Sequence, residues 1–468
     1  MSKMTRRSFV NRSIESATAL AATTSALSVA QPAPAPSAND KVVLALVGAG
    51  GRGRMVIKNM AKLENVEVKY VCDVEDKRGA AAVGELEKLQ GSAPQFVGEM
   101  RKVLDDKDID GVVVATPEHW HALATVWACQ AGKDVYVEKN VAASIWEGRK
   151  MIEAARKYKR IVQSGSQTRS APYISAARDY IKEGGLGRVM YVKVFGMYSF
   201  VYGGYPRKPV PDSDPPAGLD WDQWLGPAPE VPYNSQLHRQ WYGYWRFSGG
   251  NGSDAIHTLD AARMVIGDPP HPKSVQCVGG RWKFEEDDGV MPDVQIVAYE
   301  FDKMAMSFEC TGFTEKYMFK TPMGIRQSDQ LPFWPLNTSR IEIYGTERMM
   351  YVGRVGGGWQ VLEAGPPDMK GALADGFGNV VAQGYGRFPD EPHAANFIDC
   401  IRTREMPNAD IEQGHMAACL EHMANLSYRL GNAKLAFDGA TETFVGNDEA
   451  NGHLKPSYRK HYRVPDEV

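Results

Sequence analysis

The stretch Val42-Val-Leu-Ala-Leu-Val-Gly-Ala-Gly-Gly-Arg-Gly53 decides the fold of this chain. Its first part, Val42–Val47, is apolar at every position without alternation, which is typical of a strand buried on both faces of a sheet. Its second part is a Gly-x-Gly-x-x-Gly loop, and the residues that follow, 55–62, have helical spacing. A glycine loop between a buried strand and a helix is typical of a dinucleotide-binding unit.

Each glycine of this loop has a physical role in such a unit. Gly48 allows the tight turn, Gly50 lets the backbone approach a pyrophosphate, and Gly53 lets the helix pack closely on the strand. The N-terminus of the helix then faces the phosphates. We expect the cofactor to contact the loop residues Gly48, Gly50, Gly51, Arg52 and Gly53.

Strand and helix patterns alternate from residue 41 to residue 165. Further strands are predicted at residues 66–72, 111–115, 135–137 and 161–164, with helices at 80–89, 118–131 and 144–157 between them. Such repetition predicts a parallel, doubly wound sheet. Asp73 ends the second strand, where a carboxylate can bond the ribose hydroxyls and repel a 2′-phosphate. The sequence therefore favours NAD over NADP, a preference that Arg52 and Lys77 could weaken.

Two polar segments follow the third and fourth clear strands, at the edge where ligands bind to such sheets. In the segment 115–121, Pro117 stops the strand and His121 is predicted on the nicotinamide side; the alternative is a structural histidine. In the segment 138–140, a lysine at the end of a strand can polarise a substrate hydroxyl. The cofactor-binding residues predicted here are Thr116, Pro117, His119, Trp120, His121, Glu138, Lys139 and Gln167.

A second glycine-rich segment, residues 249–253, leads into an amphipathic helix. Asp254 and His257 are three residues apart and therefore share one face of that helix. A histidine that titrates near neutral pH is a natural base for taking a hydroxyl proton while hydride leaves the same carbon. The alternative is a core histidine bonded to the backbone. We predict Lys139, His257 and Asp254 as catalytic residues.

The N-terminus has the pattern of a twin-arginine export signal. Arg6 and Arg7 are followed by Phe9, an apolar Ala/Thr/Ser-rich stretch occupies residues 17–29, and a Pro-rich linker ends near residue 40. The signal predicts export of a folded protein by the twin-arginine machinery, so that the protein is periplasmic or otherwise exported. Free nicotinamide cofactor is essentially absent there, so we expect the cofactor to be loaded beforehand and held tightly.

Composition excludes several classes of partner. The formal net charge of -3 gives no reason to expect nucleic acid as a partner. After the signal, no run of apolar residues is long enough for a membrane-spanning helix, so no membrane anchor is expected. The six cysteines show no zinc-type or redox-type spacing, which predicts buried free thiols and no metal site.

The pattern changes after residue 165. Strands are predicted at residues 189–197, 274–279, 294–301, 305–310, 339–344 and 349–352, and they are mostly antiparallel in character. Helices are predicted at residues 173–182, 393–403 and 411–430, and residues 202–234 are predicted to be a long ordered loop. We therefore expect a boundary near residue 165 between two domains.

The glycine loop, the Ala-Thr-Pro segment with His121, the Glu138-Lys139 pair and the His257 helix together resemble the Gfo/Idh/MocA oxidoreductase family. The resemblance runs from residue 41 to the end of the chain and is strongest to the exported bacterial branch. It implies an α/β protein with a Rossmann domain at 41–165 and an α+β domain at 166–468, built on an open, mostly antiparallel sheet. It also implies a homo-oligomer and oxidation or reduction of a sugar or cyclitol hydroxyl.

The resemblance assigns Lys139 to substrate and cofactor contact and His257 to acid/base chemistry. Two positions depart from the family pattern, since Asn140 replaces the usual proline and Ser253 replaces the usual aspartate, with Asp254 displaced by one. The segment 241–247 is similar to one in NAD-using α-N-acetylgalactosaminidases, and its two tryptophans could alternatively be one packed helix face. The substrate-binding residues implied are Lys139, Trp245, Arg246, Asp254 and His257.

Three functions remain open at this point. The first is an NAD(P)-dependent carbohydrate oxidoreductase whose cofactor is reoxidised in place by a second carbonyl substrate, as in glucose–fructose oxidoreductases. The second is a glycosidase or lyase that oxidises the sugar transiently, eliminates a group and returns the hydride. The third is a sugar-binding protein without catalytic activity.

Overall fold

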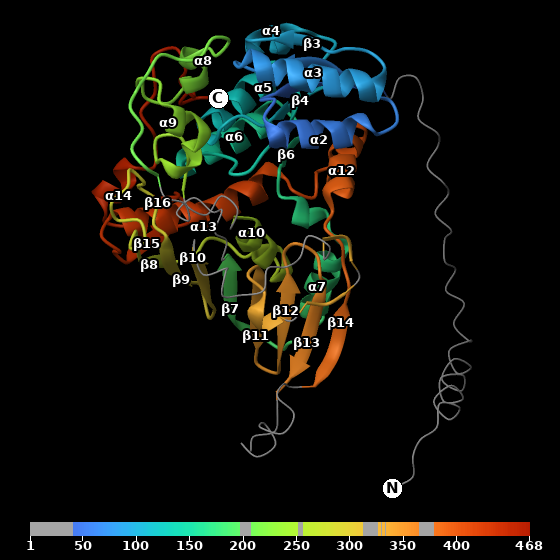
Figure 1. Cartoon of the computed structure of the whole chain (residues 1–468). Coiled ribbons are helices and arrows are strands. Elements are labelled where there is room, and N and C mark those ends of the chain that lie inside the picture. Colours follow the sequence, from blue (N-terminus) through green and yellow to red (C-terminus); the bar gives the residue numbers. More distant parts are fainter. Residues whose placement is uncertain are drawn as a thin grey trace, which may run out of the picture. The chain divides into compact units, whose positions relative to one another are not determined.

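The computed structural model describes residues 41–196, 207–250, 256–311, 326–328, 330–332, 334–364 and 379–468. Residues 41–468 form one compact unit (Figure 1). The predicted export signal and linker at 1–40 lie outside the described residues. Asp254, which the sequence predicts as catalytic, also lies outside them.

Six parallel strands form the first sheet, as the strand and helix alternation predicts. Their order is β3-β2-β1-β4-β5-β6, so β1 lies at the centre and the order reverses between β1 and β4. The strands are β1 (Val42–Val47), β2 (Val66–Cys72), β3 (Gln95–Val97), β4 (Gly111–Val114), β5 (Asp134–Val137) and β6 (Val162–Ser164). The sequence analysis did not predict β3, a strand of three residues at the edge of the sheet.

Helices cover both faces of this sheet, because β1 is apolar on both sides. Leu44 and Leu46 pack with α2 (Gly51–Ala61) and α3 (Asp76–Gln90). Ala45 and Val47 belong to the core of the other face. The helices on that face are α4 (Met100–Asp105), α5 (His121–Gln130) and α6 (Ile145–Lys157), and the short η2 (Glu118–Trp120) leads into α5.

Two helices from late in the chain pack on the first sheet as well. Phe397 and Ile398 of α12 (Asp390–Thr403) are buried with α2 and with the Leu44 side of β1. Ile411 and Ala417 of α13 (Ile411–Arg429) join the core of the opposite face. The dinucleotide-binding layer therefore has apolar contacts that come from residues far along the chain.

The second sheet has ten strands in the order β14-β13-β12-β11-β7-β10-β9-β8-β15-β16. Only the pair β7 and β10 is parallel among the pairings of the described strands, so the prediction of a mostly antiparallel sheet is confirmed. The strands are β7 (Val189–Gly196), β8 (Ser274–Gly280), β9 (Val294–Glu300), β10 (Ala305–Thr311), β11 (Arg340–Gly345), β12 (Arg348–Gly353), β13 (Trp359–Glu363), β14 (Val380–Gly384), β15 (Leu435–Asp438) and β16 (Thr443–Phe444).

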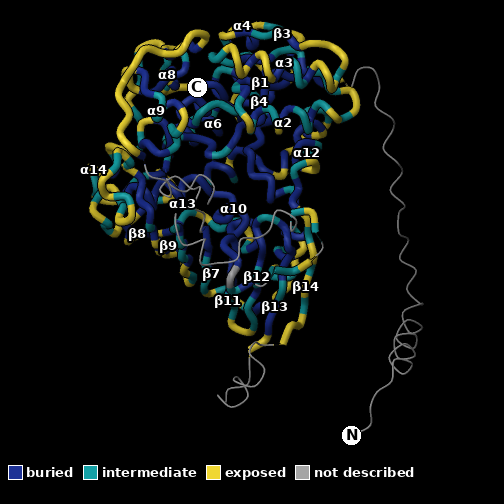
Figure 2. The backbone as a smooth tube through the Cα atoms, in the orientation of Figure 1, coloured by how far each residue is buried: buried dark blue, intermediate teal, exposed yellow. Residues whose placement is uncertain are grey.

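One face of this sheet packs on α7 (Pro172–Lys182), α10 (Ile256–Val265) and α13, and these elements share one hydrophobic core. The traces of α10 and α13 are mostly buried (Figure 2). Val278 and Ile296 point to the other face and are exposed. The sheet is therefore open on one side, and the homo-oligomer expected through such a face stays a prediction.

The described part of the predicted long loop, residues 207–234, contains regular structure. It contains α8 (Trp221–Leu225), and α9 (Ser235–Arg239) and η4 (Trp241–Gly243) follow it. The rings of Trp221 and Trp224 stack with their centroids 4.5 Å apart. These segments and Phe247 form a separate apolar cluster beside the first sheet. The remaining short elements are η3 (Gln167–Ser170), η7 (Trp334–Leu336) and α14 (Asp448–Gly452).

A buried ion-pair network holds α10 in place. The Nε atom of Arg169 in η3 lies 2.7 Å from Oδ1 of Asp260, and its Nη2 atom lies 2.6 Å from Oδ1 of Asp268. Both Arg169 and Asp260 are buried, so each charge depends on its partner. This network therefore fixes the helix that carries His257.

The structure also bears on the cysteines and on membrane-spanning helices. All six cysteines are buried and none forms a disulfide, as expected. Within the described ranges, no helix combines the length and the apolar character needed to span a bilayer.

The packing of α12 against the first sheet leads to a stability prediction. Replacing Phe397 with Ala removes a fully buried ring and should lower the free energy of unfolding by about 3–5 kcal/mol. Denaturant unfolding measures this change, and Met406→Ala, at an exposed site just beyond α12, is the matched control. An effect no larger than that of the control would show that α12 is not part of this core.

Candidate functional site

A cavity of about 260 Å³ opens at the carboxyl ends of β1, β2 and β4. The order of the strands reverses between β1 and β4, which is where sheets of this kind bind their ligands. The cavity is lined by residues from three strand ends, the glycine loop and the aromatic cluster: Val47, Gly48, Gly50, Gly51, Arg52, Cys72, Asp73, Val74, Glu75, Arg78, Gly98, Glu99, Met100, Ala115, Thr116, Pro117, Trp120, Gln223, Trp224, His238, Arg239, Trp241 and Tyr462.

The glycine loop lies so close to β4 that side chains do not fit. Gly48 has a φ of 94°, and a β-carbon there would lie 2.6 Å from the backbone of Ala115 and Thr116. A β-carbon on Gly53 would lie 2.1 Å from the carbonyl oxygen of Gly48. The roles predicted for these two glycines, a tight turn and close packing of helix on strand, correspond to these contacts.

The N-terminus of α2 is open to an anionic ligand. Gly50 is its N-cap residue, with no side-chain cap, and its first turn carries no acidic residue. A β-carbon on Gly51 would meet no atom within 4 Å. Unsatisfied amide groups and the positive end of the helix dipole are what a pyrophosphate requires.

Asp73 is anchored to the loop by two backbone amides. Its Oδ2 atom accepts a hydrogen bond from the amide of Ala49 at 2.6 Å, and Oδ1 accepts one from Glu75 at 2.8 Å. Burial raises the pKa of Asp73, while these two bonds oppose the shift. Arg52 and Arg78 line the cavity with Asp73, whereas Lys77 is not among the lining residues.

The residues present fit a dinucleotide. The cavity combines a glycine cradle, an open helix N-terminus and a carboxylate beyond the second strand. The Oγ1 atom of Thr116 is buried in the cavity wall and forms no hydrogen bond within the described part of the chain, so it is a polar atom that a ligand can use. The Rossmann site therefore has the partners that NAD needs.

A chain of charges links the glycine loop to the end of β5 and to α12. The Nε atom of Arg52 lies 2.7 Å from Oε1 of Glu138, and its Nη1 atom lies 3.8 Å from Asp390. Arg326 also pairs with Asp390, at 2.9 Å. A side chain at Gly165 would meet the Glu138 carboxyl at 2.9 Å, so β6 packs tightly against it. These contacts fix the backbone just before Lys139.

Gln167 is buried below this charge chain. Its Nε2 atom donates to the hydroxyl of Tyr136 at 3.1 Å, and that hydroxyl lies 3.4 Å from Oε1 of Glu138. Gln167 does not line the cavity. In this structure it supports Glu138 from the interior, and its predicted contact with the cofactor stays a prediction.

His257 lies in the first turn of α10 and is buried. Burial lowers the pKa of His257 well below its usual value, and the charges of Arg354, Lys139, Arg52 and Arg326 lower it further. Lys139, from the end of β5, therefore lies within electrostatic range of His257. The two predicted catalytic side chains therefore act on one another electrostatically, but Glu138, Lys139 and His257 are not among the residues that line the cavity.

His119 and His121 have different surroundings from those expected of cofactor ligands. The Nε2 atom of His119 lies 2.9 Å from the carbonyl oxygen of Trp224, and burial lowers its pKa to about 4. His121 contacts two backbone carbonyls, that of Asn140 at 2.6 Å and that of Thr116 at 2.9 Å. Neither histidine lines the cavity, whereas Trp120 between them does. His121 joins the ends of β4 and β5, which is the structural alternative considered above.

Glu118, within the segment 115–121, was assigned no role from the sequence. Its Oε2 atom accepts hydrogen bonds from the hydroxyl of Ser248 at 2.8 Å and from the amide of Gly249 at 2.9 Å. Burial raises the pKa of Glu118 to about 6, although Lys139 lowers it. Glu118 therefore connects the glycine-rich segment that precedes α10 with the region around Lys139.

Asn140, which replaces the proline usual in the family, forms a hydrogen bond with a distant residue. The Nδ2 atom of Asn140 donates to Oε2 of Glu421 on α13 at 2.9 Å, and the Lys139–Asn140 peptide bond is cis.

The predicted substrate residues Trp245 and Arg246 do not line the cavity. The Arg429 guanidinium lies 5.3 Å from the Trp245 ring, and Arg246 is exposed. Trp245 also lies beyond the helical turn η4 (Trp241–Gly243), so the two tryptophans do not form one helix face.

Comparison with protein families agrees with this arrangement. Residues 42–166 match an oxidoreductase family with an NAD-binding Rossmann fold, and residues 173–296 and 377–464 match the C-terminal alpha/beta domain of the same family. This chain belongs to the Gfo/Idh/MocA oxidoreductase family. The family resemblance and the fold class expected from the sequence are thereby confirmed.

Two curated relatives show how far sequence similarity extends. A 1,5-anhydro-D-fructose reductase of Ensifer adhaerens is 26% identical over 364 residues, which cover 73% of this chain and 96% of that protein. A glycosyl hydrolase family 109 protein of Stenotrophomonas maltophilia is 34% identical over 144 residues, which are 30% of each chain. For the second relative, similarity is therefore limited to less than a third of its length.

Solved structures show the same fold over most of the chain. A levoglucosan dehydrogenase in complex with NADH and levoglucosan has a TM-score of 0.59 at 18% identity, covering 87% of this chain and 100% of that one. The WlbA dehydrogenase of Bordetella pertussis, in complex with NADH and UDP-GlcNAcA, has a TM-score of 0.60 at 20% identity, covering 86% and 99%.

The close contact at Gly53 leads to a prediction about cofactor binding. Gly53→Ala places a methyl group against the Gly48 carbonyl, so the loop must move and NADH binding should weaken at least about tenfold. Titration of NADH by protein fluorescence or calorimetry measures the affinity. The control is Gly84→Ala in α3, where the added carbon meets no atom within 4 Å. Equal affinities in the two variants would contradict the assigned site.

Proposed function

We propose that this protein is an exported oxidoreductase that moves hydride between a tightly held nicotinamide cofactor and a hydroxyl or carbonyl group of a sugar or cyclitol. The observation that carries the proposal is the dinucleotide cavity at the carboxyl ends of β1, β2 and β4. Lys139 follows β5, the strand next to β4, and its charge acts on His257. The names of the relatives, an anhydrofructose reductase and a levoglucosan dehydrogenase, support a carbohydrate substrate.

The residues that would hold the cofactor follow from the cavity. The glycine loop and the N-terminus of α2 would bind the pyrophosphate, and Asp73 would bind the ribose hydroxyls. A carboxylate at this position favours NAD over NADP, although Arg78 lies beside it. When bound, the nicotinamide supplies a hydride acceptor or donor.

His257 would act as the base during oxidation of a hydroxyl. Burial and four nearby cations lower its pKa, so it is neutral near physiological pH and can accept the hydroxyl proton. Lys139 would donate a hydrogen bond to the substrate oxygen and stabilise negative charge that develops there. The network of Arg52, Glu138 and Asp390 would keep the backbone before Lys139 in position.

The proposals of export and of tight binding support each other. A protein carrying the predicted twin-arginine signal would reach a compartment without free nicotinamide cofactor. Reoxidation in place would then require a second carbonyl substrate. The name of one structural neighbour, the aldose-aldose oxidoreductase of Caulobacter crescentus with a TM-score of 0.58, supports a sugar as that second substrate.

A glycosidase is the second candidate. The observation that favours it is the group of glycosyl hydrolase family 109 relatives, including the one that is 34% identical over 144 residues. In that case hydride would return to the same sugar after elimination of the aglycone. The bound cofactor would show no net change.

A panel of sugars, cyclitols and aryl glycosides separates these functions. For the oxidoreductase, at least one sugar or cyclitol should reduce the bound cofactor, and Lys139→Ala should lower kcat/KM by at least about 100-fold. The control is Lys434→Ala, whose side chain is 60% exposed on the second sheet. Aglycone release without net reduction would establish the glycosidase instead. Full activity of Lys139→Ala would reject the proposed site.

The charges around His257 predict a specific pH effect. Because Arg354 lowers the pKa of His257, Arg354→Met should raise it. His257 would then become protonated, and stop acting as a base, at a higher pH than in the wild type. The pH below which kcat/KM for hydroxyl oxidation falls should therefore be higher in the variant. The control is Arg348→Met, since Arg348 instead bonds the Gly185 carbonyl at 3.0 Å. An unchanged limb in the Arg354 variant would contradict the role of His257 as the base.

A further inference from the structure

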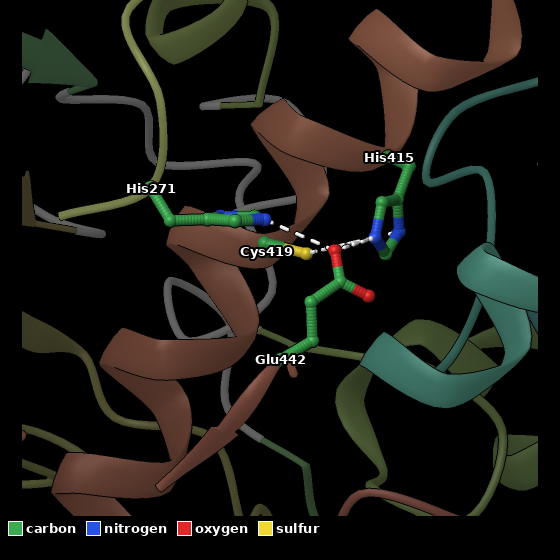
Figure 3. Close-up of side chains that lie close together, drawn as sticks. All are labelled: His271, His415, Cys419 and Glu442. Atoms are coloured by element: carbon green, nitrogen blue, oxygen red, sulfur yellow. Dashed lines mark hydrogen bonds and ion pairs between the residues drawn. The ribbon is translucent and has the colours of Figure 1, made fainter. Parts of the chain in front are cut away.

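A second cluster of reactive side chains lies away from the dinucleotide cavity (Figure 3). His271 precedes β8, His415 and Cys419 lie one turn apart on α13, and Glu442 lies in the turn between β15 and β16. None of the four residues lines the cavity. Three separate segments of the second domain therefore converge on one point.

The potential ligand atoms of the cluster are close together. Oε1 of Glu442 lies 2.8 Å from Nε2 of His415 and 3.0 Å from Nε2 of His271. The Sγ atom of Cys419 lies 3.4 Å from Nε2 of His415. One ligand atom from each residue lies within 4.8 Å of the other three, a separation that a single ion can bridge.

The cluster is buried, and its surroundings restrict its movement. His415, Cys419 and Glu442 are all less than a tenth exposed. A β-carbon on Gly148 of α6 would lie 2.3 Å from Nδ1 of His415, so that helix packs directly against the imidazole ring. Arg149 on the same helix contacts both carboxylate oxygens of Glu442, at 3.0 and 2.6 Å. The carboxylate is thus oriented from outside the cluster.

The donor set is chemically selective. Two imidazole nitrogens, one thiolate and one carboxylate oxygen match the ligands and the number that tetrahedral zinc prefers. Calcium and magnesium prefer oxygen ligands and do not suit this set. Arg149, which donates to both carboxylate oxygens of Glu442, corresponds to the outer partners that orient metal ligands.

We propose that His271, His415, Cys419 and Glu442 bind one Zn²⁺ ion. The two Nε2 atoms, Sγ and one carboxylate oxygen would occupy its four positions, which leaves none for substrate, so the ion would be structural. Binding releases the proton of the Cys419 thiol, since the thiolate is the ligand. The ion would fasten α13 to the segment before β8 and to the turn between β15 and β16.

The same four residues could instead form only a hydrogen-bonded network, in which both histidines donate to Glu442. Metal content distinguishes these possibilities without any use of activity. The full-length protein, purified in metal-free buffer and supplied with Zn²⁺, should retain about one zinc per chain by plasma mass spectrometry. Zinc binding should also raise the thermal unfolding midpoint, because the ion binds the folded state.

Variants give the second arm of the test. Cys419→Ala and His271→Ala should each weaken zinc binding more than the roughly 10–100-fold that loss of an outer partner causes. The matched control is Cys129→Ala, a buried cysteine of the first domain, which should bind zinc normally. Wild-type protein that holds no more zinc than the two ligand variants would overturn the proposal.

A spectroscopic measurement on the unmodified chain keeps the test independent of how the variants fold. Co²⁺ in place of zinc should give a thiolate-to-cobalt charge-transfer band together with the visible bands of tetrahedral cobalt. The weak spectrum of octahedral cobalt, without a thiolate band, would likewise overturn the proposal. Failure of the zinc site would leave the oxidoreductase proposal untouched.

Discussion

The site depends on the absence of side-chain atoms between the glycine loop and the end of β4. Gly48 and Gly53 leave no room for a β-carbon, so loop, strand and helix meet at backbone distance. This contact leaves the N-terminus of α2 open at the carboxyl ends of β1 and β4, where the order of the strands reverses. The Asp73 carboxylate, Thr116 and the segment before Lys139 are then all arranged around the same edge.

Buried and partly buried charges hold the segments that carry the proposed catalytic side chains. Arg52, Glu138 and Asp390 connect the glycine loop with β5 and α12, while Arg169, Asp260 and Asp268 hold the helix of His257. Breaking a buried pair leaves an uncompensated charge, so such networks resist rearrangement. The contacts of Arg52 with Glu138 and Asp390 thus join the two domains, and the cations around His257 favour its neutral, proton-accepting form.

Sequence patterns predicted five of the six strands of the parallel sheet, because β1 and β4 are continuous apolar runs and helices alternate with the strands. They missed the short edge strands β3 and β16 and the strands β13–β15, whose patterns are brief. Local spacing led to the glycine loop and Asp73, which line the cavity together with Arg52 and Arg78, whereas Lys77 is not among the lining residues. Spacing along the chain does not reveal tertiary contacts, and for this reason it did not indicate Glu118 near Lys139, or Arg326 and Arg354 near His257. The same holds for the group that contains His271 and Glu442.

The most direct test of this account is the nucleotide content of the protein from its native host. The protein should be purified without added cofactor, denatured and analysed by mass spectrometry. We expect close to one nicotinamide dinucleotide per chain, predominantly NAD(H), because a protein exported to a compartment without free cofactor, as proposed above, would have to hold its cofactor tightly. Protein that carries no nucleotide, and that takes up neither NAD nor NADP on reconstitution, would contradict the central claim.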